Sequence, residues 1–195
     1  VTCNTIFFNE KIKEPLYKKN IKQGYVFEEL LKNYNLSLET LIIKKKFALN
    51  SNIFFDKSLS YISDFDFFLR LSRNCKLKYV PDILSGWRVH HESESWKRPN
   101  KFNEEKKFFI KKIENFYPEI ASSYKNLWLK FKIDTLKKNA IYLIMNKLPQ
   151  EARIEIKRNF IFDMQIIIIY FLSFFFFSKN LFRFILNKRK KVKPT

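Results

Sequence analysis

The hydrophobic pattern of the chain changes near residue 100, and no other feature limits its possible folds as much. Before this point, short strand-like runs alternate with short helix-like runs, which is typical of a layered α/β fold. After it, long amphipathic segments separated by Pro118 and Pro149 predict helices. We therefore expect an α/β region at 1–98, a helical extension at 99–150, and an apolar helix with a basic tail near a membrane at 151–195.

The elements expected before residue 100 are short. Runs rich in β-branched and aromatic residues predict strands over residues 1–8, 16–18, 38–43, 77–80 and 83–89. Helical spacing predicts helices over residues 26–32, 44–49 and 63–72. The last of these helices should have Ser63 or Asp64 at its N-cap and Arg70 on its outer side. Its inward-facing residues should be Phe67, Phe68 and Leu71.

Beyond residue 100, the pattern predicts helices over 104–117, 124–147 and 151–162, followed by an apolar run at 164–177. As a helix this run reaches only ~21 Å, short of the ~30 Å hydrocarbon core of a bilayer. A buried or in-plane interfacial helix is therefore favoured over a membrane span. Because a basic cluster at 187–193 follows, we expect residues 164–195 to bind a membrane surface. The alternative is a helix packed on the domain with a solvated tail.

The net charge of +19 lies mostly in the C-terminal half. Residues 1–95 carry fifteen basic and eleven acidic residues, whereas residues 96–195 carry 23 and eight. Thirty of the 38 basic residues are lysines, although specific base recognition favours arginine. We therefore expect an anionic membrane surface as a partner, and no specific nucleic acid.

Two cysteines, Cys3 and Cys75, lie far apart without a second ligand pair, which argues against a zinc site and a disulfide framework. A reducing, cytosolic setting is expected. The chain has no initiating methionine, and residues 1–8 look like a strand already under way. This suggests a truncated chain.

Asp64 and Asp66 are the carboxylates most able to do chemistry, and three interpretations are open. As an Asp-x-Asp pair they could bind Mg²⁺ or Mn²⁺. Alternatively, Asp64 could be a general base at a helix N-terminus, with Asp66 turned into the first helical turn. Both could also have no chemical role and only cap the helix, where their charge interacts favourably with its dipole. Spacing supports a base over a metal pair, because helix follows Asp64 at once.

Arg88 and His90 are two positions apart, so on a strand they project to the same face. There they could hold phosphate oxygens, the arginine through bidentate bonds. The alternative is that His90 is a structural residue whose hydrogen bonds are made within the protein. The chain has only two glycines and no glycine-rich phosphate loop.

Taken in order, several segments resemble the second half of a family 2 glycosyltransferase: residues 24–31, 40–45, 55–56, 63–71, 79–81 and 87–90. The resemblance covers about residues 1–98. It implies a GT-A fold, so that the expected fold class is the C-terminal part of a GT-A-like layered α/β fold followed by a helical region. It also implies inverting transfer of one sugar from a nucleotide-sugar to an acceptor hydroxyl, in cell-surface polysaccharide or glycolipid synthesis.

The resemblance also implies roles for individual residues. Asp64 matches the family's catalytic base. Ser63 replaces the glutamate that precedes it in the family and is a candidate for donor or acceptor binding. Arg88 and His90 match a segment beside the donor diphosphate, and His90 is a candidate metal ligand. Thr40 begins one of the matching segments and is a further candidate for donor or acceptor binding. Arg70 is expected to brace the helix through a carboxylate.

The family's nucleotide-binding half, with the main ligands of a divalent Mg²⁺ or Mn²⁺, would lie upstream of Val1. Without it, this chain alone is expected to be inactive. The expected partners are a nucleotide-sugar donor and a saccharide or lipid-linked acceptor. The expected location is cytoplasmic, at the cytoplasmic face of the membrane. The rival hypothesis is a non-enzymatic basic protein that binds membranes or nucleic acid. In that case the carboxylates only cap helices and form salt bridges.

Overall fold

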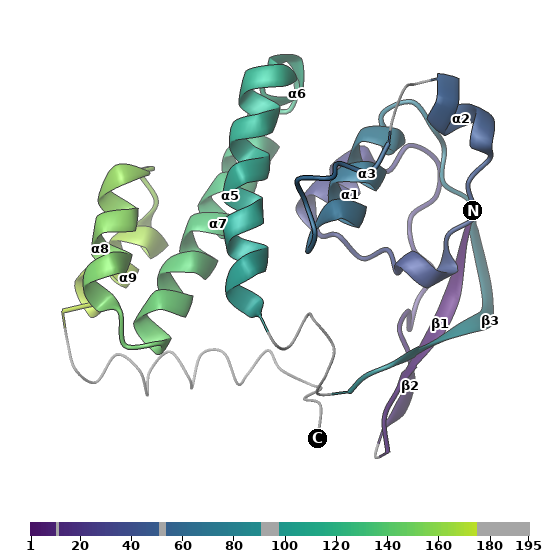
Figure 1. Cartoon of the computed structure of the whole chain (residues 1–195), viewed down its shortest axis with the longest axis horizontal. Coiled ribbons are helices and arrows are strands. Elements are labelled where there is room, and N and C mark those ends of the chain that lie inside the picture. The colour runs from purple at the N-terminus through teal and green to yellow at the C-terminus, as the bar shows by residue number, and fades with distance from the viewer. Residues whose placement is uncertain (11, 51–53, 91–97, 175–195) are drawn as a thin grey trace. The chain divides into compact units, whose positions relative to one another are not determined.

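The computed structural model describes residues 1–174 except 11, 51–53 and 91–97. The fold is of mixed α/β class and divides into two compact units. The first contains Val1–Pro99, and the second begins at Asn100. Figure 1 shows strands in the first unit, and helices in the described part of the second.

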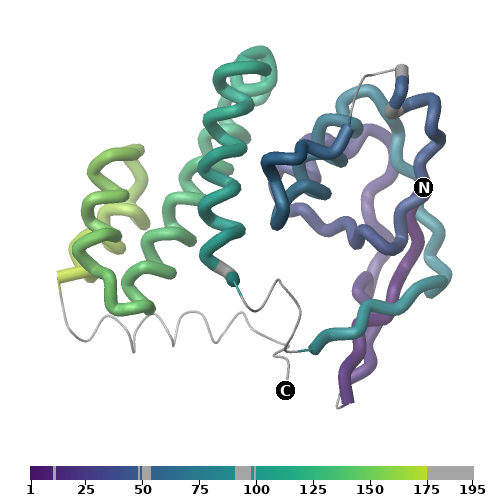
Figure 2. The backbone as a smooth tube through the Cα atoms, viewed as in Figure 1, coloured from purple at the N-terminus to yellow at the C-terminus, as the bar shows by residue number. Residues whose placement is uncertain are grey.

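A three-stranded mixed sheet forms one side of the first unit (Figure 1). Its central strand, β1 (Thr2–Phe8), pairs antiparallel with the short β2 (Lys13–Pro15). On the other side it pairs parallel with β3 (Tyr79–Arg88). A parallel pair requires a long crossover, and the segment between β2 and β3 supplies it with helices, as the smooth trace in Figure 2 shows.

The predicted strands are correct at residues 1–8 and need correction elsewhere. β2 lies over Lys13–Pro15, slightly before the expected 16–18. The strand expected at 38–43 is wrong, because Leu38–Thr40 is a 3-10 helix, η1. Its turn is closed by the amide and hydroxyl of Thr40, which donate to the Ser37 carbonyl at 3.0 and 2.7 Å. Local hydrogen bonds of this kind compete with strand pairing.

The break expected at Pro81 and Asp82 is also wrong, since β3 continues through both residues. The pairing of β1 with β3 jumps from Val80 to Ile83 at this point. The register shift leaves Pro81 without a paired position on β1, and so the missing N–H of proline removes no ladder bond there.

The described part of the first unit also contains the α-helices α1 (Phe27–Lys32), α2 (Lys45–Asn50) and α3 (Ser63–Ser72). Gly24 precedes α1 with a φ of +85°, a backbone conformation that favours glycine. It exchanges two backbone hydrogen bonds of 2.8 Å with Leu77, at the start of the segment leading into β3. The apolar face of α1 is buried as its spacing predicts, and α1 contacts α3.

The described part of the second unit consists of α5 (Pro99–Phe116), α6 (Pro118–Ser123), α7 (Lys125–Met145), α8 (Pro149–Arg158) and α9 (Met164–Leu172). The three predicted helices are confirmed with altered bounds, and α6 was not predicted. Pro118 and Pro149 stand in the first turns of α6 and α8, where proline costs no helical hydrogen bond. The rest of the expected apolar and basic region, residues 175–195, lies outside the described residues.

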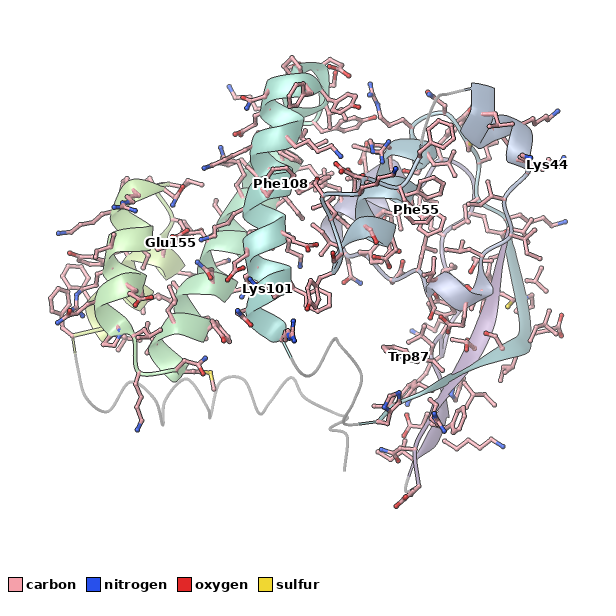
Figure 3. All side chains as sticks on the ribbon, in the orientation of Figure 1. Lys44, Phe55, Trp87, Lys101, Phe108 and Glu155 are labelled. Carbon is pink, nitrogen blue, oxygen red and sulfur yellow. The ribbon has the colours of Figure 1, made fainter. Side chains whose placement is uncertain are left out.

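The core of the second unit joins α7, α8 and α9. It consists of Leu136, Ala140, Ile144, Ala152, Ile156, Ile166 and Ile169. Phe109 of α5 packs on α7, with its ring 6.1 Å from Trp128 and 6.0 Å from Phe131. Lys107 and Glu155 form an ion pair at 3.1 Å that links α5 to α8, where Figure 3 labels Glu155. The helices beyond residue 150 thus share a core with those before it.

Candidate functional site

Asp64 lies within the first turn of α3, not at its cap. Ile62 occupies the N-cap position, and no side chain caps the helix, so the expectation that Ser63 or Asp64 would cap it is wrong. Ser63 and Asp64 are instead the first two helical residues, and both are half-buried. A carboxylate in this turn still interacts favourably with the helix dipole.

A tyrosine that the sequence analysis did not identify holds the Asp64 carboxylate. The hydroxyl of Tyr34 donates to Oδ2 of Asp64 at 3.0 Å. The Tyr34 ring meets Phe65 edge-on, with ring centres 5.4 Å apart. Burial, reinforced by the negative charge of Asp64, raises the pKa of Tyr34 far above its usual value. Tyr34 is therefore a permanent proton donor to Asp64 at physiological pH.

Asp66 has a different environment from Asp64. It is fully buried, and its Oδ2 accepts from Nε of Arg70 at 3.0 Å and from Nη2 at 2.5 Å. Nη2 also donates to the carbonyl of Phe54 at 2.7 Å. The guanidinium therefore neutralises Asp66 and ties α3 to the preceding loop. This confirms the expected bracing role of Arg70.

The side chain of Arg70 is only 11% exposed, so the expectation that it faces outward is wrong. Its partner Asp66 lies one helical turn earlier and is buried, and so the arginine folds back along the helix. The inward orientation of Phe67, Phe68 and Leu71 is confirmed, since all three are buried. Phe67 also stacks on Phe55, with ring centres 4.3 Å apart, and Figure 3 labels Phe55.

The residues of this region do not fit a divalent metal. Asp66 is sequestered by Arg70, so Asp64 and Asp66 do not converge as an Asp-x-Asp ligand pair. In the described part of the chain, no group of three histidine, cysteine or acidic side chains could hold a metal ion. The metal interpretation of this pair therefore has no geometric support, and no chemical step is assigned to a metal here.

Thr40 is occupied by structural hydrogen bonds. It is buried, and its hydroxyl donates its proton to the Ser37 carbonyl at 2.7 Å. The 2.6 Å contact with Thr2 must then be donated by the Thr2 hydroxyl. This pair ties η1 to β1, and so Thr40 is engaged in the fold and not displayed to a ligand.

Arg88 and His90 lie together at the end of β3. Arg88 is the last strand residue, and His90 follows after Val89. Both are exposed, whereas Val89 is buried and its amide donates to the Phe8 carbonyl at 2.8 Å. The alternation places the two candidate residues on the same exposed side. Among the described residues, no hydrogen bond or ion pair joins either of them to Asp64.

The chemistry open to this region is therefore that of a single carboxylate. One oxygen of Asp64 is oriented by Tyr34, and the other makes no hydrogen bond within the described residues. Such a group can accept a proton from a bound hydroxyl. Comparisons of the chain with protein-family models, with curated proteins and with solved structures found no match.

Proposed function

We propose that this chain is the acceptor side of an inverting glycosyltransferase that moves a sugar from a nucleotide-sugar to an acceptor hydroxyl. The supporting observation is the division of roles between two neighbouring carboxylates. Asp66 is buried and neutralised by Arg70, whereas Asp64 is half-buried and oriented by Tyr34. The ordered resemblance over residues 1–98 assigns the base role to Asp64 of this pair.

The proposed reaction is one displacement at the anomeric carbon. The acceptor hydroxyl gives its proton to the free oxygen of Asp64 while its oxygen bonds to the anomeric carbon. The bond from that carbon to the diphosphate oxygen breaks, and its electron pair leaves with the diphosphate. General-base assistance of this kind contributes roughly 10²–10⁴-fold in rate.

Tyr34 and Arg70 act in this mechanism by positioning. The Tyr34 hydroxyl fixes the carboxylate plane of Asp64 through Oδ2, which leaves Oδ1 for the acceptor. Arg70 fixes the helix that carries Asp64 through its bonds to Asp66 and to the Phe54 carbonyl. Because neither residue needs to touch substrate, both are positioning residues.

Arg88 and His90 are proposed to contact the leaving diphosphate. Their shared exposed side offers a guanidinium, which binds phosphate oxygens in a bidentate manner, beside an imidazole. We further propose that nucleotide and metal are bound by polypeptide outside this chain. The acceptor would be a saccharide or a lipid-linked saccharide at the cytoplasmic face of a membrane.

The test uses the product of the complete coding sequence with a panel of uridine- and guanosine-diphosphate sugars and a lipid-linked saccharide extract. Asp64→Asn should reduce release of nucleoside diphosphate by at least about 100-fold, because the base is lost. Nucleotide binding, measured by calorimetry, should not change. Asp82→Asn is the matched control, since Asp82 is an exposed acid on β3 of the same unit. Undiminished turnover in Asp64→Asn would refute the base assignment.

A further inference from the structure

We propose that the α8–α9 end of the second unit binds the surface of an anionic lipid bilayer through an exposed apolar patch. This lipid-binding patch consists of Phe160, Phe162, Met164, Ile168, Phe171 and Phe174. The inference rests on the geometry of α8, α9 and the turn between them. It therefore does not depend on the transferase chemistry proposed for the first unit.

Helix α9 is apolar on two faces, and only one of them is used by the core. Ile166 and Ile169 are buried against α7 and α8. Met164, Ile168 and Phe171 follow one another at spacings of four and three, so they form a stripe on a different face. Their side chains are 64%, 51% and 61% exposed. An exposed apolar stripe of this kind marks an interaction surface.

The turn between α8 and α9 extends the stripe with two aromatic rings. Phe160 and Phe162 are 60% and 79% exposed. Phe160 also helps to line a hollow of ≈ 200 Å³, together with Ile167 and Phe171. Phenylalanine rings on the apolar side of an interfacial segment are buried at the boundary between headgroups and acyl chains.

Cationic side chains border the patch. The guanidinium of Arg153 lies 4.4 Å from the ring centre of Phe174, and the ammonium of Lys157 lies 5.9 Å from that of Tyr170. The nearby carboxylates have other partners: Asp163 caps α9, and Glu155 pairs with Lys107 of α5. Asp163 keeps its negative charge as a cap, but Arg153 and Lys157 outnumber it, so the border carries a net positive charge that complements anionic phosphate headgroups.

The charge around the lipid-binding patch and the length of the described helices favour a bilayer surface as the partner that covers the patch. In the described part of the chain, no helix is long and apolar enough to cross a membrane. A second copy of the patch would bring two cationic borders together, since residues 96–195 carry 23 basic against eight acidic residues. The sequence after the patch, residues 175–195, adds seven basic and no acidic residues. In-plane binding to anionic lipid satisfies both the apolar patch and its cationic border.

Sedimentation of the full chain with vesicles tests this proposal. Equimolar phosphatidylglycerol–phosphatidylcholine vesicles should bind the chain, and pure phosphatidylcholine vesicles should bind it much more weakly. The double variant Phe162→Ser, Phe171→Ser should lose about 100-fold in affinity, from about ten-fold for each ring withdrawn from lipid. Phe116→Ser is the matched control, because Phe116 is 75% exposed on α5 outside the patch. It should bind as the wild type does.

A second measurement separates the patch from the basic residues that follow it. A tryptophan introduced as Phe162→Trp should shift its emission to shorter wavelength when anionic vesicles are added, whereas Phe116→Trp should not. Vesicle binding without that shift would assign binding to the basic segment alone and overturn the proposal. Wild-type affinity in the double variant would also overturn it, as would a dimer that the double variant abolishes, since the occupant would then be a second copy.

Discussion

The Tyr34 hydroxyl and the Asp64 carboxylate, thirty positions apart in the sequence, are joined by a hydrogen bond of 3.0 Å. Tyr34 lies in the segment between α1 and η1, and Asp64 lies in the first turn of α3. The bond therefore connects two parts of the first unit at the residue that we propose as the base. It gives the carboxylate one fixed oxygen and one that remains for a substrate.

Tyr34→Phe should reduce kcat about ten-fold, because the carboxylate loses the charge-assisted bond that orients it, worth about 1.5–3 kcal/mol. Asp64 itself is retained, so the reduction should be smaller than in Asp64→Asn. KM for the acceptor should change little. Steady-state kinetics on the product of the complete coding sequence measure both quantities. A Tyr34→Phe enzyme with unchanged kcat would show that the bond has no catalytic consequence.

Arg70→Leu should destabilise the first unit by about 3–5 kcal/mol, because it removes the cation that neutralises the buried Asp66 carboxylate. The double variant Asp66→Leu, Arg70→Leu should recover much of that loss, since no buried charge remains. Urea unfolding of the two single variants and the double variant gives the coupling free energy. Lys57→Leu, at an exposed position before α3, serves as the control. Additive losses would contradict a buried ion pair.

Local spacing argued against Asp64 and Asp66 as a metal pair, but it left their roles open and could not find Tyr34. A helix places Asp66 and Arg70 one turn apart, so their pairing follows from positions i and i+4. The partner of Asp64 depends on how the segment between α1 and η1 folds over α3. No periodicity within a short window carries that information.

One physical cause explains both why the strand predicted at 38–43 is wrong and why Thr40 is not available to a ligand. The β-branched residues within 38–43 favour a strand, yet local bonds from Thr40 to Ser37 close a 3-10 turn instead. The same turn buries Thr40 against Thr2. The 3-10 turn therefore explains both the conformation and the burial of Thr40, and its contact with Thr2 of β1 lies beyond what residues 38–43 alone can show.

Lys106→Met should stabilise the protein at neutral pH by roughly 2–3 kcal/mol, because the fold disfavours the charged ammonium, whose pKa falls from 10.5 to about 8. Lys106 shares the inner stripe of α5 with Phe109 and Ile113. Burial, together with the charge of Lys138, lowers its pKa to about 8. Thermal unfolding measures the effect, and Lys111→Met on the exposed side of α5 is the control.

The same lysine predicts a pH dependence. Above about pH 8, folded Lys106 releases its proton, whereas the unfolded chain keeps it until pH 10.5. Since the unfolded state then binds more protons, the free energy of unfolding should rise with pH in this window. The Lys106→Met variant should lack that rise. An equal rise in wild type and variant would show that another group is responsible.

Tyr17 predicts the opposite slope at higher pH. Burial is the main cause that raises its pKa to about 12, against an ordinary value of 10.0. The unfolded chain therefore loses this proton first, and the free energy of unfolding should fall between pH 10 and 12. Tyr17→Phe should flatten this fall, although it also removes the hydroxyl that donates to Asn35. Chemical unfolding at a series of pH values checks the slope.

Asp163→Ala should shorten α9 from its N-terminus and destabilise the second unit by about 1 kcal/mol. The Asp163 carboxylate accepts from the amides of Gln165 and Ile166, both at 3.0 Å, so its removal leaves two amides of the first turn without this acceptor. Asp163→Asn should retain most of the stability, since the amide oxygen can still cap.

The same change links the cap to lipid binding. Met164 begins the exposed stripe of α9, so fraying of the first turn disperses the patch that we propose as the lipid-binding surface. Asp163→Ala should therefore weaken vesicle binding, although it removes a negative charge and would strengthen a purely electrostatic attraction to anionic lipid. The two mechanisms predict opposite signs. Tighter binding by Asp163→Ala would favour electrostatics over an ordered α9, whereas weaker binding that Asp163→Asn restores would favour the structured patch.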